Sequence, residues 1–312
     1  MKDTLDTLRR RLTAQVVGAD DAAYLLIAAL LAGGHVLIQG APGIGKTSLA
    51  KTLARLIDGT FRRVQFTPDL LPSDLLGHSI YRQSTGVFEF VEGPVFCHLM
   101  LADEINRTSP RIQSALLECM NESQVSIDGV TRPLSSPFLV IATQNNRYAA
   151  GTFPLPEPQL DRFLLSVEMR LPDAASQTEI LRLHASGAAG DADAPPLVDI
   201  ETVVRWQEQV RAIPVSDALC HYLVAVCEAA RRHPDLKDGV SARGSIALMR
   251  ASQAIAAMEG HEAVYPDDVK RAAIPVLAHR LTPAGEDLGT EQPRRGRVVA
   301  SLREILDSTP VP

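Results

Sequence analysis

Residues 40–47, GAPGIGKT, join an apolar strand-like run, HVLIQG (35–40), to a segment that predicts a helix. This strand–loop–helix context is the one that the pattern G-x-x-x-x-G-K-[ST] requires for a phosphate-binding loop. Gly43 and Gly45 let backbone N–H groups turn inward, and the helix points its positive end at the same place. The loop therefore predicts both a phosphate site and an α/β unit around it.

The residues that we expect to bind nucleotide here are Gly40, Ala41, Pro42, Gly43, Ile44, Gly45, Lys46, Thr47 and Ser48. Lys46 is expected to reach the β- and γ-phosphates, and the Thr47 hydroxyl to ligate Mg²⁺. The alternative is an ordinary glycine-rich turn between a strand and a helix. Such turns seldom carry Gly-Lys-Thr at the start of the helix, so the phosphate site is the stronger interpretation.

The first two-thirds of the chain alternates short apolar strands with helical stretches, which favours a parallel sheet covered by helices. The expected strands are 35–40, 61–66, 98–104, 138–144 and 164–169, and the expected helices are 46–57, 109–121 and 157–163. The apolar run 22–32 reads as a buried helix, too short to cross a bilayer. Two segments, 79–91 and 124–137, predict inserted hairpins, the second with an Asp-Gly turn.

After Pro172 the pattern becomes helical, with helices expected at 199–211, 216–232, 243–259, 266–280 and 298–307 and no convincing strand. The segment 186–196 predicts a loop, and 282–297 an exposed irregular chain. We therefore expect two domains, an α/β nucleotide-binding core at 1–172 and a smaller all-α lid with a C-terminal tail at 173–312.

Composition excludes little but sets limits. The 312 residues carry 31 basic and 37 acidic side chains, a formal charge of −6, which disfavours broad binding to nucleic acid. The four cysteines lack the spacing of a zinc site, so we expect reduced thiols in the core. The N-terminal stretch MKDTLDTLRRRL has no apolar signal segment. Together these features predict a cytoplasmic protein without a membrane span.

Asp103 and Glu104 end the buried run LMLADE. In parallel α/β sheets ligands bind at the carboxyl ends of the strands, so both acids are expected beside the phosphate loop. Asp103 would join the Mg²⁺ shell, and Glu104 would orient or deprotonate the attacking water. A solvated helix cap is the alternative, which the phosphate loop makes the weaker one.

Three further polar residues are ambiguous taken singly. Asn145 follows the strand 138–144 and could hold the water between Glu104 and the γ-phosphate, or simply form a turn. Arg162 could pair with Asp161 at the surface. Arg243 lies near the start of a predicted helix in the second domain.

Taken together, the chain resembles the AAA+ ATPases, and within them the MoxR family of the helix-2-insert clade. The similarity extends from VVGADDA (16–22) to VLAHRL (276–281), and the most specific stretches are VEGPVFCHLMLADEINR, QSALLECMNESQVSIDG, FLVIATQNN, GTFPLPEPQLDRFLLSV and VYPDDVKRAAIPVLAHRL. The resemblance implies a P-loop core with a helical lid, ATP and Mg²⁺ as cofactors, and ATP hydrolysis.

The resemblance also implies roles for single residues. Lys46 and Thr47 correspond to the Walker A residues, Asp103 and Glu104 to Walker B, and Asn145 to sensor 1. Arg162 resembles an arginine finger that acts in a neighbouring subunit, and Arg243 a sensor 2 arginine. Val17 and Gly18 correspond to the segment that packs on adenine. Arg107 matches a family position whose role, in cis, in trans or structural, stays open.

Two positions depart from the family pattern. Glycine replaces a small apolar residue at Gly45, which leaves nucleotide binding intact. Asn146 replaces the proline that usually follows sensor 1, which could slow hydrolysis.

The expected function is an ATP-driven, chaperone-like remodelling of partner proteins by a homo-oligomer, a hexameric ring in which Arg162 acts in trans. The resemblance suggests a von Willebrand factor A domain partner, and enzyme maturation or metal-centre assembly as the task. A nucleic-acid motor and a nucleotide-regulated scaffold with weak turnover remain alternatives. The acidic balance disfavours nucleic acid as a partner, and the complete Walker B pair disfavours the scaffold.

Overall fold

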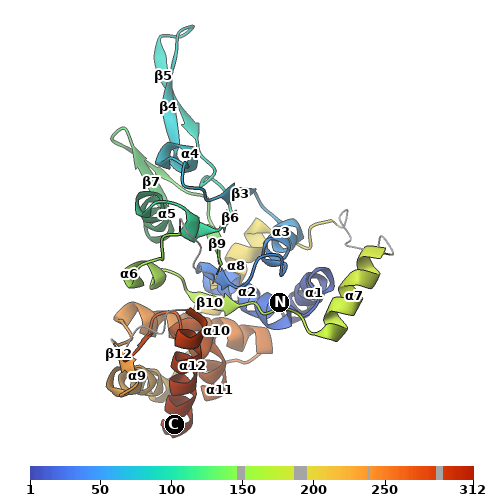
Figure 1. The fold of residues 1–312 in the computed structure, drawn as a ribbon, viewed down its shortest axis with the longest axis vertical. Coiled ribbons are helices and arrows are strands. Elements are labelled where there is room, and N and C mark those ends of the chain that lie inside the picture. Colours follow the sequence, from blue (N-terminus) through green and yellow to red (C-terminus); the bar gives the residue numbers. More distant parts are fainter. Residues whose placement is uncertain (146–151, 186–194, 238, 286–290) are drawn as a thin grey trace.

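The computed structural model describes residues 1–145, 152–185, 195–237, 239–285 and 291–312. Figure 1 shows an α/β part above a group of helices, with one hairpin projecting from the α/β part. The helices are α1 (Lys2–Gln15), α2 (Asp20–Ala32), α3 (Lys46–Leu56), α4 (Pro72–Leu76), α5 (Pro110–Glu122), α6 (Glu157–Leu160), α7 (Ala174–Ala185), α8 (Ile200–Arg211), α9 (Asp217–Arg232), α10 (Ala242–Glu259), α11 (Pro266–Leu277), α12 (Glu291–Ser308) and the 3₁₀ turn η1 (Ile105–Arg107).

A five-stranded parallel sheet forms the centre of the α/β part, in the order β10–β1–β9–β6–β3. Its strands are β1 (Val36–Gln39), β3 (Phe61–Gln65), β6 (Leu99–Asp103), β9 (Leu139–Gln144) and β10 (Leu165–Glu168). These confirm the five predicted strands. Because β9 pairs with β6 and with β1, the ends of three strands that carry candidate site residues lie side by side.

Strands β1, β6 and β9 are buried on both faces, as their continuous apolar sequences require, whereas the edge strand β3 is partly exposed. Along β6, Leu99 and Leu101 face one apolar cluster and Met100 and Ala102 face the other. Helix α2 lies in the first cluster with nearly every side chain buried, which explains why its sequence shows no polar face.

Both predicted hairpins are present. They are β4 (Gly77–Arg82) with β5 (Val87–Glu92), and β7 (Gln124–Ile127) with β8 (Val130–Pro133). In Figure 1 the β4–β5 hairpin extends away from the sheet, and the β7–β8 hairpin lies on the same side of the molecule. A hydrogen bond from Ser79 Oγ to Asp128 Oδ2, at 2.6 Å, connects the two hairpins.

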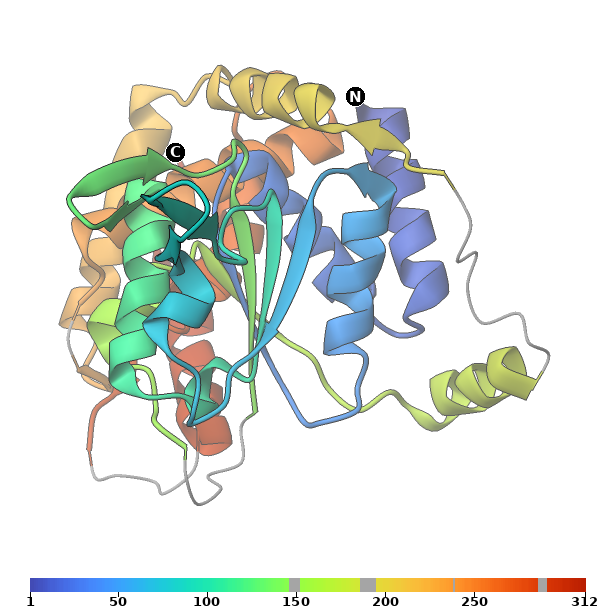
Figure 2. The same ribbon diagram turned by 90° about the horizontal axis from the view of Figure 1, so that it is seen from above.

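The helices differ from prediction in three places. Helix α7 was not expected; it has no buried residue among those described and stands apart from the other helices in Figure 2. Helix α12 begins at Glu291 and not near 298, so the expectation of an irregular exposed chain at 282–297 is wrong from Glu291 onward. Helix α6 ends at Leu160 and is a single turn.

The second part also contains two-residue strands. β12 (Leu236–Lys237) pairs with β13 (Thr282–Pro283), and β11 (Val198–Asp199) pairs with β2 (Ile57–Asp58) of the α/β part. Helix α8 packs against α2 as well as α10. The predicted boundary near residue 172 stays a prediction, and the loop expected at 186–196 lies mostly outside the described residues.

The cysteine expectation is correct for three side chains and wrong for one. Cys97, Cys119 and Cys227 are buried free thiols, whereas Cys220 is exposed on α9. Burial raises the pKa of Cys97 and of Cys119 to about 12, so these thiols stay protonated. None of the described helices is long and apolar enough to cross a membrane.

Candidate functional site

The phosphate loop lies between β1 and α3, where the sequence placed it. Gly45 has φ +92° and is the residue before the first turn of α3, so the left-handed backbone requires a glycine there. No side chain caps the N-terminus of α3, and its first N–H groups are therefore available to an anion. A Cβ at Gly43 would meet no atom within 4 Å, so the loop is open on that side.

Lys46 is the first residue of α3, directly after the loop glycines, and is buried. Its Nζ donates to the carbonyl oxygen of Gly40 at 2.6 Å, to that of Gln144 at 3.3 Å and to Asn145 Oδ1 at 2.8 Å. Burial lowers the pKa of Lys46, and the nearby charges of Asp103 and Glu104 oppose that shift. The ammonium group is thus held at the end of the sheet where a phosphate on α3 would lie.

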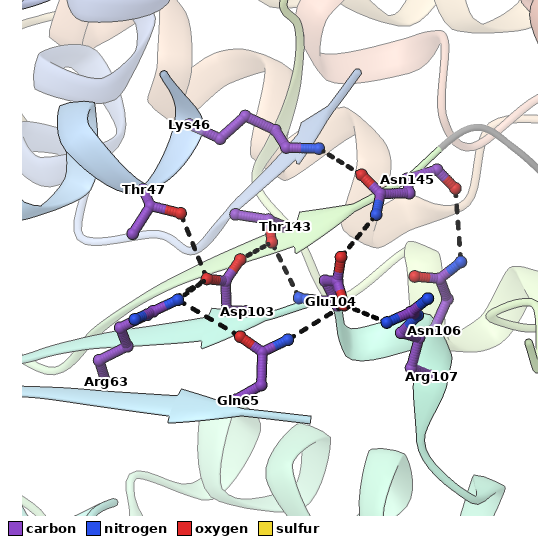
Figure 3. Close-up of polar contacts among 10 residues, drawn as sticks. All are labelled: Lys46, Thr47, Arg63, Gln65, Asp103, Glu104, Asn106, Arg107, Thr143 and Asn145. Carbon is purple, nitrogen blue, oxygen red and sulfur yellow. Dashed lines mark hydrogen bonds and ion pairs between the residues drawn. The ribbon is translucent and has the colours of Figure 1, made fainter. Parts of the chain in front are cut away.

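The acid pair lies where β6 ends, directly beside the loop (Figure 3). Asp103 Oδ2 accepts from Thr47 Oγ1 at 3.2 Å, and Asp103 Oδ1 accepts from Thr143 Oγ1 at 2.6 Å. Burial raises the pKa of Asp103, but hydrogen bonds from Thr143, Arg63 and Thr47 outweigh it, so the net pKa is below the ordinary value. Asp103 is therefore an anion. Its carboxylate oxygen and the Thr47 hydroxyl are oxygen ligands of the kind that Mg²⁺ prefers.

Glu104 is held by three donors. Its Oε1 accepts from Asn145 Nδ2 at 2.7 Å, and its Oε2 accepts from Gln65 Nε2 at 3.1 Å and Arg107 Nη1 at 2.9 Å. The amide of Asn145 therefore touches both Lys46 and Glu104 (Figure 3). This arrangement joins the phosphate loop, the acid pair and the end of β9 into one cluster.

Several members of the cluster were missed from the sequence. Thr143 precedes Asn145 by two residues, and Arg63 and Gln65 share one face of β3 because side chains alternate along a strand. The spacing of these residues was visible in the sequence. The sequence did not show that the edge strand β3 pairs with β6, because that pairing follows from the strand order of the folded sheet. Asn106 also contributes, donating from Nδ2 to the Asn145 carbonyl at 3.4 Å. Asn146 lies outside the described residues.

Val17 and Gly18 lie close to Ile44 of the loop, and their expected contact with adenine stays a prediction. A cavity of about 460 Å³ is lined by Val17, Gly18, Ile44 and Pro172, among others. Its polar lining includes Glu168 and Ser176. The segment before α2, the loop and the start of α7 thus line one cavity, whose volume is in the range of small-molecule sites. Of the other predicted loop residues, Ala41 and Pro42 lie in the loop and Ser48 lies on the first turn of α3. Pro42 and Ser48 are exposed.

The two remaining arginines do not join the cluster. Arg162 Nη1 donates to the Leu117 carbonyl at 2.7 Å, and its side chain lines a groove beside α5. The surface ion pair with Asp161 is not formed, because Asp161 binds Arg280 Nε at 2.8 Å. Arg243 is exposed on the first turn of α10. Burial is the main cause that lowers the pKa of Arg280, and the nearby charge of Arg243 lowers it further.

The described residues contain no cluster of His, Cys, Asp and Glu that would hold a metal by itself. A magnesium site made of Thr47 and Asp103 is completed only by ligands of another kind, such as phosphate oxygens and water. The donor set therefore fits Mg²⁺ bound together with a nucleotide.

Comparison with known proteins identifies the class of protein. Residues 35–165 match the model of the ATPase family associated with various cellular activities (AAA), and residues 228–298 match the AAA lid domain. A solved structure from Cytophaga hutchinsonii, provisionally described as an ATPase, superimposes with a TM-score of 0.88 at 35% identity, covering 100% of this chain and 96% of that one. The class is thus an AAA ATPase with an α/β core and a helical lid.

The relatives narrow the class. The chain is 44% identical to the uncharacterized protein YeaC of Bacillus subtilis, covering 95% of this chain and 91% of that one. It is 40% identical to chaperone MoxR1 of Mycobacterium tuberculosis, over 88% and 75% of the two chains, and 30% identical to protein MoxR of Methylorubrum extorquens, over 100% and 96%. The chain belongs to the MoxR family of AAA ATPases.

Proposed function

We propose that this chain hydrolyses ATP with Mg²⁺ and uses the energy to remodel partner proteins, as a chaperone. The observation that carries hydrolysis is the Asn145 amide, which holds Glu104 at 2.7 Å and Lys46 at 2.8 Å at once. A carboxylate fixed beside the phosphate-binding lysine is in the place of a general base for an attacking water.

The chain's own residues divide the work. The loop N–H groups and Lys46 bind the phosphates, Thr47 and Asp103 hold the metal, and Glu104 orients the water and accepts its proton. Bound Mg²⁺ supplies positive charge to the phosphate oxygens. Val17 and Gly18 pack against the adenine, in the cavity that they line together with Ile44.

The test of hydrolysis is Glu104→Gln. The amide cannot accept the proton of water, so we expect ATP binding to remain and turnover to fall by about 100-fold or more. Binding is measured by calorimetry and turnover by phosphate release. Glu262→Gln, the same change at an exposed position, is the matched control. Unchanged turnover in the Glu104→Gln protein would refute the role of Glu104 as the base.

The proposal extends to assembly. Arg162 makes its described hydrogen bond to α5 and none to the phosphate loop, which is what an arginine that serves a neighbouring subunit requires. Head-to-tail contacts of this kind form a ring when the rotation between subunits closes. We propose a ring of six subunits, and we propose that the chain belongs to the helix-2-insert clade. Arg243 is proposed to reach the nucleotide of its own subunit when the lid rotates.

The relative named chaperone MoxR1 supports action on other proteins. We propose a von Willebrand factor A domain protein as the partner, a cytoplasmic setting, and enzyme maturation or metal-centre assembly as the task. The Glu104→Gln protein is the reagent for this test, because it retains ATP and should hold its client. Capture of a von Willebrand factor A protein that wild type releases with ATP would support the proposal, and capture of nucleic acid instead would overturn it.

A further inference from the structure

The expected Walker B aspartate, Asp103, is in contact with an arginine that the sequence did not predict. Arg63 lies on β3 next to β6, and its Nη2 and Nε are 2.7 and 3.2 Å from Asp103 Oδ2. Thr47 Oγ1 donates to that same oxygen at 3.2 Å. Arg63 thus occupies the oxygen of Asp103 that faces Thr47, where the metal would bind (Figure 3).

Charge explains the contact. The Asp103 side chain is only 9% exposed, and a carboxylate that has lost most of its water needs a positive partner. Lys46 directs its described hydrogen bonds to Gly40, Gln144 and Asn145, so the cation in contact with Asp103 is Arg63.

The position of Arg63 also allows it to leave. Its side chain is 43% exposed on an edge strand, so the guanidinium can move from Asp103 into water at little cost in solvation. Its other described contact within the cluster is weak, a 3.3 Å hydrogen bond to Gln65 Oε1. A replaceable counter-ion needs this combination of a close ion pair and an open path to solvent.

We propose that Arg63 is the resident counter-ion of Asp103 and exchanges with Mg²⁺. Without the metal, Arg63 neutralises Asp103 and reduces its repulsion of a triphosphate. With the metal bound, Arg63 leaves Oδ2. Arg63 therefore makes nucleotide binding less dependent on Mg²⁺. The inference rests on the proposed nucleotide site and adds to it a residue that sets its metal dependence.

The test compares nucleotide affinity with and without metal. A non-hydrolysable ATP analogue is titrated calorimetrically into the full chain in excess Mg²⁺ and again in EDTA. In Arg63→Gln the affinity in EDTA should fall, and the affinity in Mg²⁺ should stay or rise, so that the ratio of the two increases about tenfold. Arg63→Lys, which keeps the charge, should recover most of the wild-type ratio.

Arg62→Gln is the matched control, because it removes the same charge from the same strand. Arg62 points to the opposite face, where its charge lowers the pKa of Cys97 against the larger effect of burial. The control should leave the ratio at the wild-type value. Thermal unfolding of each variant checks that it is folded.

The outcomes separate this inference from the proposed function. If wild type binds the analogue but Arg63→Gln leaves the ratio unchanged or lowers it, Arg63 is not exchanged for the metal and the inference is wrong. An equal rise in Arg62→Gln would also overturn it, since the effect would then come from net charge and not from contact. If wild type fails to bind the analogue even in Mg²⁺, the proposed nucleotide site itself is wrong.

Discussion

The backbone of Glu104 has a left-handed conformation, with φ 59° and ψ 49°, which residues other than glycine rarely adopt. Four hydrogen bonds hold it there. Its N–H donates to Thr143 Oγ1 at 2.9 Å, and its carboxylate is fixed by Asn145, Gln65 and Arg107. Such strain persists only where the surroundings determine it, and it is common at functional sites. For Arg107 the structure answers part of an open question, because the contact with Glu104 is made within one chain.

A second constrained residue is the buried His35, which directly precedes β1. It predicts that the stability of the protein depends on pH. Its Nδ1 accepts from the Val140 N–H and its Nε2 lies 3.0 Å from the Met120 carbonyl, so the ring is neutral with its proton on Nε2. Burial lowers the pKa of His35 from 6.5 to about 4.

Unfolded His35 takes up a proton below about pH 6.5, whereas folded His35 stays neutral until about pH 4. The stability that His35 contributes is therefore complete above pH 6.5 and is lost as the pH falls to 4. We expect the free energy of unfolding to fall over this window by up to about 3 kcal/mol from this residue alone. Denaturant unfolding between pH 7 and 4.5 measures it.

His35→Gln should lower stability at pH 7 and flatten the pH dependence, because one proton fewer is taken up on unfolding. His221→Gln removes an exposed histidine and should leave the slope nearly as in wild type. Equal slopes for wild type and His35→Gln would show that His35 titrates normally in the folded protein.

At the scale of the elements, one buried arginine joins the second part of the chain to the sheet. Arg280 follows α11 and its side chain is 3% exposed. It donates to Asp161 Oδ1 at 2.8 Å, to the Phe163 carbonyl at 2.6 Å and to the Leu164 carbonyl at 3.0 Å. The N-cap of α10, Ser241, donates to the same aspartate at 3.0 Å. Asp161 thus connects α10, α11 and the turn that carries Arg162.

Arg280→Met should remove this connection. The Asp161 carboxylate and four backbone carbonyls lose their charged donor, so we expect a loss of about 3 kcal/mol in the free energy of unfolding. Denaturant titration measures it. Arg232→Met, which breaks an ion pair of an arginine that is 80% exposed, should cost less than about 1 kcal/mol. Similar losses in the two variants would show that the Arg280 contacts add little.

At the scale of the whole molecule, the site is incomplete in one chain if Arg162 serves its neighbour. The described phosphate loop, acid pair and Asn145 lie together, while Arg162 lies beside α5. An assembly that shares sites has a simple signature in mixed oligomers, because each subunit supplies a different half of a site.

Arg162→Ala and Glu104→Gln should each be inactive alone. When the two proteins are mixed and reassembled, some interfaces combine an intact Glu104 with an intact Arg162 from the next subunit. We expect phosphate release to recover to roughly a quarter of wild type at equal mixing, the fraction of random interfaces with both residues intact. No recovery at any ratio would contradict an arginine acting in trans.

The fold was largely readable from the sequence, for identifiable reasons. The glycine loop between β1 and α3 and the five apolar strands are local patterns, and local patterns survive without tertiary information. Helix α7 was not predicted, and the start of α12 was misjudged because this boundary depends on packing. Pro293 and Gly296 look like loop residues, yet α12 extends through them, and Arg295 on this helix donates to Gln39 and Ser166 of the sheet.

The sequence by itself determined the chemistry of the site: a lysine and a threonine after a phosphate loop, two acids after one strand and an asparagine after another. Only the tertiary structure decided which side chains meet, because the order β10–β1–β9–β6–β3 is a property of long-range pairing. That order puts Asn145 between Lys46 and Glu104, and it puts Arg63 on Asp103. Motifs specify residues, whereas contacts between distant strands specify their partners.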